Sequence, residues 1–222
     1  MKVRLIAALA LVGLLVLALM KVSSPKLPPP RSNLTFAGDS IVQGVFATNA
    51  TATVVGRLTY MHPAWFIRNY SYSGASVTGS SAVPAMNPSA IAELLAGDTD
   101  VVFLGTNDWS AAPSLAKFAD AYGNFLDTLA SAPNKPKVIC VTPIWRCEEV
   151  QNKSNAAGYT MGTLRSAIAT ACHSRGDPVI DGLKLVPNDR SYYFDGCVHP
   201  NDRGYRYFAS SLNTALSPLV TP

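Results

Sequence analysis

Short apolar runs that alternate with helical patterns are the feature that most limits the folds open to this chain. Residues 34–37, 100–104 and 137–141 form runs that are too short for helices and are typical of strands buried on both faces. Between and after them, apolar side chains recur at helical spacing, most clearly over residues 113–132 and 202–216. Strands that alternate with helices predict an α/β fold, a parallel sheet covered by helices on both sides.

The full chain of 222 residues is long enough for one sizeable α/β domain and hardly for two. Functional residues of such a sheet gather where the strands end, at their carboxyl ends. The predicted strands cover 34–37, 65–70, 100–104, 137–141 and 179–181, and the predicted helices cover 51–61, 89–96, 113–132, 159–173 and 202–216.

The N-terminal segment differs in character from the rest. Lys2 and Arg4 precede an uninterrupted apolar run over residues 5–20, a pattern that predicts a leader over residues 1–22. We expect an uncleaved membrane anchor rather than a cleaved signal peptide, because no Ala-x-Ala site follows the run. Residues 23–32, with four prolines, predict an extended tether. The remaining domain, 33–222, is therefore expected outside the cytoplasm, either anchored or secreted.

The charge of the chain is divided unevenly between leader and domain. All 14 acidic residues lie after residue 31, together with 13 of the 18 Lys and Arg residues, so the domain is close to neutral. A nucleic-acid-binding domain would carry a basic face of its own, and this composition argues against one.

Glycine and small polar residues follow the predicted strands. Gly38-Asp39-Ser40 follows the first of them and places Ser40 at a strand end and at the start of a helix. Backbone N–H groups at such a point favour negative charge that develops during a reaction. The alternative is that Ser40 only caps the helix, a common role for serine.

Four short blocks occur in order along the chain: Gly38-Asp39-Ser40, then Ser73-Gly74 after Asn69, then Gly105-Thr106-Asn107-Asp108, and finally residues 195–201. Together these blocks resemble the SGNH hydrolase family, the GDSL-like esterases and lipases. The resemblance implies a flavodoxin-like three-layer α/β/α sandwich around a mostly parallel, five-stranded sheet. It also implies that Ser40 is the nucleophile and His199 its base. The backbone amides of Ser40 and Gly74 and the side chain of Asn107 would form the oxyanion hole, although Asn107 also suits a simple turn.

The last block departs from the family pattern. The family usually places an acid three residues before the histidine, whereas Asp195 stands four residues before His199. A small bulge could absorb the extra residue, or the acid could be absent or replaced by a backbone carbonyl. We expect Asp195 to be the third member of the triad, because no other acid lies just upstream of His199.

The resemblance implies a serine esterase that needs no metal and no organic cofactor. No lid-like insertion is apparent, so we expect small acyl esters, such as O-acetyl groups on carbohydrate. Trp109 and Trp145 follow strand ends and could line the substrate site or simply pack at its rim. An acyltransferase that uses the same residues and a catalytically inactive, membrane-anchored binding module are the alternatives. The natural ester and the oligomeric state stay open.

The four cysteines of an exported domain predict disulfides, for which three pairings exist. Cys147 and Cys197 both follow predicted strand ends on the side of the candidate site. We therefore predict a Cys147–Cys197 disulfide that fixes the loop carrying His199. A zinc site is disfavoured, because the sequence has no Cys-x-x-Cys pair.

Overall fold

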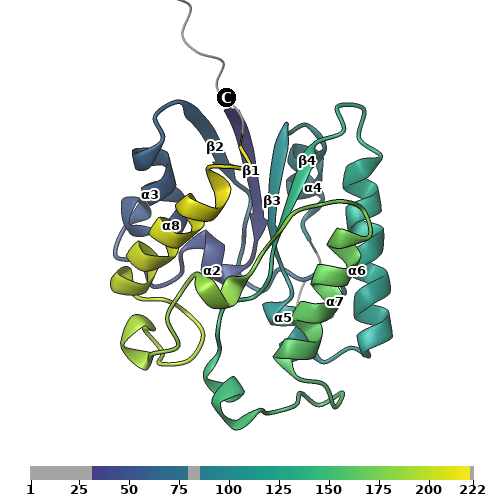
Figure 1. The fold of residues 1–222 in the computed structure, drawn as a ribbon, viewed down its shortest axis with the longest axis vertical. Helices are drawn as coiled ribbons and strands as arrows, with labels where there is room; N and C mark the ends of the chain where they lie inside the picture. The colour runs from purple at the N-terminus through teal and green to yellow at the C-terminus, as the bar shows by residue number, and fades with distance from the viewer. Residues whose placement is uncertain (1–31, 80–85, 221–222) are drawn as a thin grey trace, which may run out of the picture.

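The computed structural model describes residues 32–79 and 86–220. Its centre is a five-stranded parallel sheet in the order β2-β1-β3-β4-β5 (Figure 1). The strands are β1 (Ser32–Gly38), β2 (Trp65–Asn69), β3 (Thr99–Phe103), β4 (Lys137–Val141) and β5 (Val179–Ile180). The predicted α/β class and the five parallel strands are thus confirmed.

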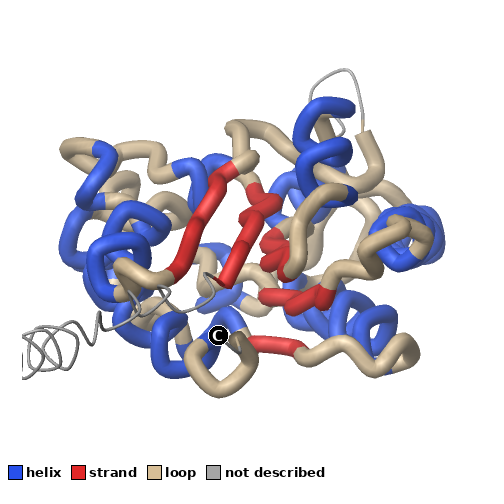
Figure 2. Tube along the Cα trace, turned by 90° about the horizontal axis from the view of Figure 1, so that it is seen from above, coloured by secondary structure: helices blue, strands red, loops and turns tan. Residues whose placement is uncertain are grey.

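Helices cover both faces of this sheet, which gives three layers (Figure 2). One face packs against α3 and α8, and the other packs against α4, α6 and α7. Two short helices, α2 and α5, begin where β1 and β3 end. The helices are α2 (Ser40–Gln43), α3 (Val54–Met61), α4 (Pro88–Leu95), α5 (Thr106–Ala111), α6 (Leu115–Ala130), α7 (Met161–His173) and α8 (Asp202–Leu216).

The strands are apolar at successive positions because helices cover both faces of the sheet. Successive side chains of a strand point to opposite faces. Phe36 and Val101 belong to the core on the α3 and α8 side, whereas their neighbours Ala37 and Val102 belong to the core on the other side. All four side chains are buried, so each central strand is apolar on both faces.

The predicted boundaries of β4 and α8 agree with the structure, whereas the first long helix starts later than predicted. Ala50–Ala52 form a separate 3-10 turn, and the side chain of Thr53 then caps α3 by accepting a hydrogen bond from the N–H of Gly56. A threonine cap ends the preceding segment because its backbone is extended rather than helical. Ser32 already belongs to β1, so the domain starts one residue earlier than the predicted tether boundary.

The domain begins at Ser32, at one end of the sheet, and the candidate site lies at the other end, where the strands finish. The yellow segment that follows α8 lies beside the start of β1 (Figure 1), and Lys137 at the start of β4 donates to the carbonyl of Leu219. The predicted leader, 1–22, lies outside the described residues. None of the helices that the described residues form combines the length and the apolar character needed to span a bilayer.

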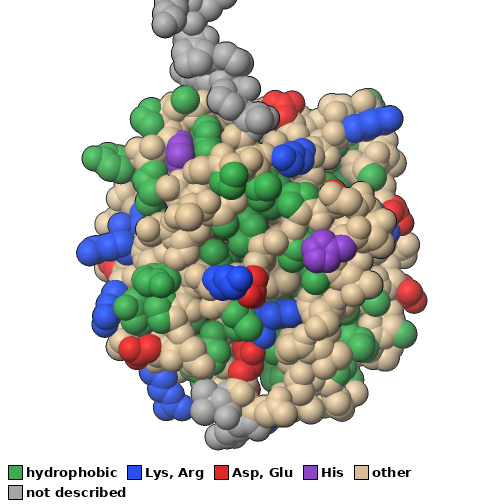
Figure 3. Space-filling model, in the orientation of Figure 1, with side chains coloured by type: hydrophobic (Ala, Val, Ile, Leu, Met, Phe, Trp, Pro, Cys, Tyr) green, Lys and Arg blue, Asp and Glu red, His purple; other side chains and the backbone are tan. Residues whose placement is uncertain are grey.

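Two disulfides tie the domain together. Cys147–Cys197 confirms the predicted pair, and Cys140–Cys172 joins β4 to α7. Disulfides persist in oxidising compartments, so the presence of these two disulfides indicates an extracellular or periplasmic protein. The face drawn in Figure 3 mixes acidic and basic side chains with scattered apolar ones, as the near-neutral charge of the domain predicts.

Candidate active site

Ser40 lies at the turn between the central strand β1 and the short helix α2. Asp39 caps this helix, since its Oδ1 accepts a hydrogen bond of 2.9 Å from the N–H of Ile41. Gly38 permits the close packing here, because a Cβ at this position would lie 2.8 Å from both Ser71 Oγ and Val42. The backbone therefore presents the Ser40 side chain, half-buried, at the carboxyl end of the sheet.

His199 and Asp195 approach Ser40 from the far end of the chain. Ser40 Oγ lies 2.9 Å from His199 Nε2, and His199 Nδ1 lies 2.7 Å from Asp195 Oδ2. A carboxylate at the Nδ1 position favours the tautomer in which Nδ1 carries the proton and Nε2 is free to accept one. The structure thus brings together the three predicted catalytic side chains in one hydrogen-bonded chain.

The loop from Asp195 to His199 absorbs the extra residue in a tight turn. The other carboxylate oxygen of Asp195 accepts hydrogen bonds from the backbone N–H groups of Cys197, Val198 and His199, at 2.9, 2.8 and 3.1 Å. Gly196 adopts a left-handed conformation, with φ of 69°, which glycine accommodates without strain. The four-residue spacing is therefore compatible with a direct bond between the acid and the imidazole.

The ionisation of Asp195 follows from these contacts. Partial burial opposes the charged form, but the hydrogen bonds from Val198, the His199 ring and Cys197 outweigh it and lower the pKa of Asp195 below its ordinary value. The carboxylate is therefore charged at neutral pH, as a partner for an imidazolium requires.

The candidate oxyanion donors lie on three separate segments. Gly74 is left-handed, with φ of 82°, in the loop after β2. Asn107, in the first turn of α5, donates from Nδ2 to the carbonyl of Ala75 at 3.0 Å, which places its amide next to that loop. A primary amide has two N–H donors, so one stays available. No described residue accepts a hydrogen bond from the backbone N–H of Ser40 or of Gly74.

Two buried carboxyl groups that the sequence analysis did not single out support these loops. Asp108 accepts hydrogen bonds from the backbone N–H groups of Val77 and Thr78 and from the Thr78 hydroxyl, so it holds the segment after Gly74. Asp39 is completely buried, and this burial raises its pKa to about 6. Asp39 and Asp108 both belong to sequence blocks of the candidate site, and this position in the sequence could have marked them as supporting residues.

The two tryptophans offer almost no surface to a substrate. Trp109 is 6% exposed and donates from Nε1 to the carbonyl of Tyr159, and Trp145 is 4% exposed and packs against Tyr193. Their contacts correspond to the packing alternative rather than to an aromatic wall. Two phenylalanines that the sequence analysis did not select, Phe46 and Phe194, are exposed instead and lie beside His199.

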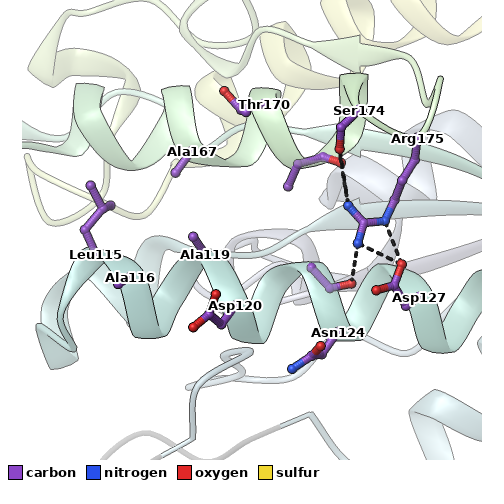
Figure 4. A pocket seen from close by; sticks show the side chains of 12 residues that line it. Leu115, Ala116, Ala119, Asp120, Asn124, Asp127, Ala167, Thr170, Ser174 and Arg175 are labelled. Carbon is purple, nitrogen blue, oxygen red and sulfur yellow. Dashed lines mark hydrogen bonds and ion pairs between the residues drawn. The ribbon is translucent and has the colours of Figure 1, made fainter.

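The groove between α6 and α7 is a different place on the molecule (Figure 4). It has a volume of about 690 Å³, and its lining includes Leu115, Ala119 and Ala167. Arg175 and Asp127 form an ion pair of 2.7 Å across it. None of its lining residues belongs to the candidate site.

One group of possible metal ligands occurs among the described residues, namely Cys147, Glu148 and Cys197. Both sulfurs belong to the disulfide and therefore cannot act as thiolate ligands. The donor set does not fit a metal centre while this bond is intact.

Several solved structures share the fold. A lipase/acylhydrolase from Enterococcus faecalis has a TM-score of 0.63 and 18% identity, over 85% of this chain and 97% of its own. A two-domain esterase active on acetylated mannans has a TM-score of 0.60 and 18% identity, over 84% of this chain and 49% of its own. A salicylyl-acyltransferase from a tetracycline biosynthetic pathway has a TM-score of 0.64 and 14% identity, over 85% of this chain and 55% of its own. This chain thus spans about half the length of the last two proteins.

A comparison with curated protein sequences finds no match. The model of the GDSL-like lipase/acylhydrolase family matches residues 36–207, which include every block described above. The protein is therefore a hydrolase that belongs to the GDSL-like lipase/acylhydrolase family.

Proposed function

We propose that this hydrolase is a serine esterase for small acyl esters, including O-acetyl esters of carbohydrate. Ser40 is the nucleophile, His199 the general base and acid, and Asp195 the group that orients and stabilises the imidazole. The observation that carries the proposal is the unbroken chain of hydrogen bonds from Ser40 Oγ through both ring nitrogens of His199 to Asp195.

The reaction has two halves. Ser40 Oγ attacks the ester carbonyl carbon while His199 Nε2 takes the hydroxyl proton, because a free serine hydroxyl is a weak nucleophile. The N–H groups of Ser40 and Gly74 and the amide of Asn107 stabilise the oxyanion, each donor being worth on the order of 3 kcal/mol of barrier. His199 then protonates the departing alkoxide oxygen, which leaves an acyl group on Ser40. Water, deprotonated by the same imidazole, releases the acid and restores the serine.

The substrate size follows from the surroundings of Ser40. The serine is only half-buried. A short acyl group needs little apolar burial in order to bind, which suits a nucleophile in this position. The esterase active on acetylated mannans is a structural precedent for a short acyl group on a bulky alcohol.

Acyl transfer is the second candidate, and the fold shared with the salicylyl-acyltransferase favours keeping it. The same acyl-enzyme would be attacked by an alcohol instead of water. We expect hydrolysis to dominate, because the half-exposed serine leaves the acyl group open to water.

The experiment is an assay of p-nitrophenyl acetate and of acetylated sugars with the full chain, beside Ser40→Ala. An esterase releases acetate, whereas Ser40→Ala does not. Products formed with added sugar acceptors, identified by mass, separate transfer from hydrolysis. Equal rates for both proteins would contradict the proposal and favour an inactive binding module.

A further inference from the structure

Two phenylalanines form an exposed, stacked pair beside the imidazole of His199. The ring centroids of Phe46 and Phe194 lie 4.2 Å apart, and the ring planes differ by 9°. Phe46 is 46% exposed and Phe194 63% exposed. The Phe46 ring also meets the His199 ring edge-on, with centroids 5.4 Å apart. We call Phe46 and Phe194 the aromatic platform.

The fold holds this platform in place at a cost in backbone conformation. Phe46 has a φ of 67°, a left-handed conformation that is rare for a bulky residue. Next to it, the carbonyl of Val45 accepts a hydrogen bond of 2.8 Å from the Tyr205 hydroxyl. Phe194 is fixed through its N–H, which donates to the carbonyl of His199 at 2.8 Å. Strained backbone that carries an exposed apolar side chain occurs preferentially at functional sites.

The chemistry of ester cleavage decides which part of a substrate reaches the platform. The imidazole must protonate the oxygen of the leaving alcohol, so the alcohol part of the ester passes next to His199. In the proposed mechanism the oxyanion is bound by Ser40, Gly74 and Asn107 and not by His199. A surface in contact with the imidazole is therefore placed to meet the alcohol part of the ester.

We propose, building on the esterase function above, that the aromatic platform is an alcohol-side subsite that binds the ring of a sugar carrying the acyl group. The two stacked rings cover one face of each other, so a ligand can meet only the outer face of a ring. That face is flat, electron-rich and without hydrogen-bonding groups, and the C–H face of a pyranose complements it. A linear alcohol covers little of it. The platform thus selects esters by the shape of their alcohol.

The test uses two acetyl esters with the full-length protein: xylose tetraacetate, whose alcohol is a pyranose, and ethyl acetate, whose alcohol is a short linear chain. We expect Phe46→Leu and Phe194→Leu to lower kcat/KM for the sugar ester by about tenfold, mainly through KM, and to change the rate with ethyl acetate by less than about twofold. Phe46→Tyr keeps the flat ring and should retain the wild-type preference. Tyr60→Leu, at an aromatic residue of α3 that is 88% exposed, is the matched control and should leave both rates unchanged.

Three results would overturn the proposal. Equal losses with both esters would mean that the platform only positions His199. Unchanged rates with both would mean that it does not touch the substrate. A larger loss with ethyl hexanoate than with xylose tetraacetate would place it on the acyl side.

Fluorophosphonate labelling of Ser40 separates this proposal from the esterase function. Labelling does not need the alcohol, so variants that label at the wild-type rate are folded and retain the Ser40–His199 pair. If they label normally without losing their preference for the sugar ester, only the platform proposal fails. If the wild-type protein does not label at Ser40, the esterase function fails and the subsite fails with it.

Discussion

Nε2 of His199 lies 2.9 Å from Oγ of Ser40, although 159 positions separate the two residues in the chain. Ser40 is carried by β1 in the middle of the sheet, and His199 by the loop that precedes α8. A bridge between Tyr193 and Pro200 closes that loop, and α8 packs on α3 beside β1. The pairing therefore depends on the packing of α8 against the sheet and not on local sequence.

Replacement of Asp195 by asparagine should lower kcat by roughly 10²–10⁴-fold, less than His199→Ala does. The amide cannot stabilise an imidazolium and disturbs the tautomer that frees Nε2. Asp189→Asn is the matched control, because Asp189 caps a similar turn by accepting from the N–H of Ser191 and makes no contact with His199. Steady-state kinetics with p-nitrophenyl acetate measure the difference. Equal activities of Asp195→Asn and Asp189→Asn would remove Asp195 from the mechanism.

Replacement of Asn107 by alanine should lower kcat by about 100-fold with a small change in KM, because an oxyanion donor acts mainly in the transition state. The side chain also donates to the carbonyl of Ala75, so urea unfolding must show that the variant is folded. Asn124→Ala, at an exposed residue of α6, should leave kcat unchanged. A variant of Asn107 with normal kcat would restrict this residue to a role in the turn.

Asp39 should make the protein less stable as the pH rises from about 4 to about 6. Burial raises its pKa from 3.8 to about 6 in the folded protein. Between these values the folded state holds a proton that the unfolded state has lost, so the free energy of unfolding falls as pH rises, by roughly 3 kcal/mol in total. Asp39→Asn keeps the cap on Ile41 and should lack this part of the pH dependence. Urea unfolding between pH 4 and 7 measures it, with Asp120→Asn on the surface of α6 as the control. Identical pH profiles for wild type and Asp39→Asn would contradict this account.

The two disulfides should differ in their effect on activity. Cys147–Cys197 holds the loop of His199, and Cys140–Cys172 lies in the core between β4 and α7. Serine substitution of either pair should lower the free energy of unfolding by a few kcal/mol. Only the loss of Cys147–Cys197 should also lower kcat/KM, by about tenfold or more, because the imidazole is then less well positioned. Activity measured well below each variant's melting temperature tests this, and equal kcat/KM values would contradict it.

The sequence predicts the strands of the sheet and the long helices to within about three residues at each end, because these depend on local patterns. The three residues of the hydrogen-bonded chain were expected from the resemblance to the SGNH hydrolase family. The residues of Lys137–Val141 form a short, mostly apolar run that can only be interpreted as a buried strand. Gly38-Asp39-Ser40 forms the turn between a strand and a helix, which also depends on neighbouring residues alone. The surroundings of the site were less predictable. Trp109 follows a strand end, as a wall residue would, but the structure turns its indole into the core against Tyr159.

The aromatic side chains beside His199 could not be predicted from the sequence, because their contact also depends on long-range packing. Phe46 and Phe194 are apolar residues in loops, and nothing in their own segments indicates that they meet. Their contact arises from the same long-range packing that joins Ser40 to His199. The Cys147–Cys197 pair was predictable because both residues follow the site-facing end of a strand or belong to a site block.

The central claim is that His199 activates Ser40, and covalent labelling of the full-length protein with a fluorophosphonate tests it most directly. Mass mapping should find the label on Ser40 in the wild-type protein, with the labelling rate reduced by about 10³-fold or more in His199→Ala and no label on Ser40→Ala. A wild-type protein that stays unlabelled, or a label on another serine, would contradict the claim.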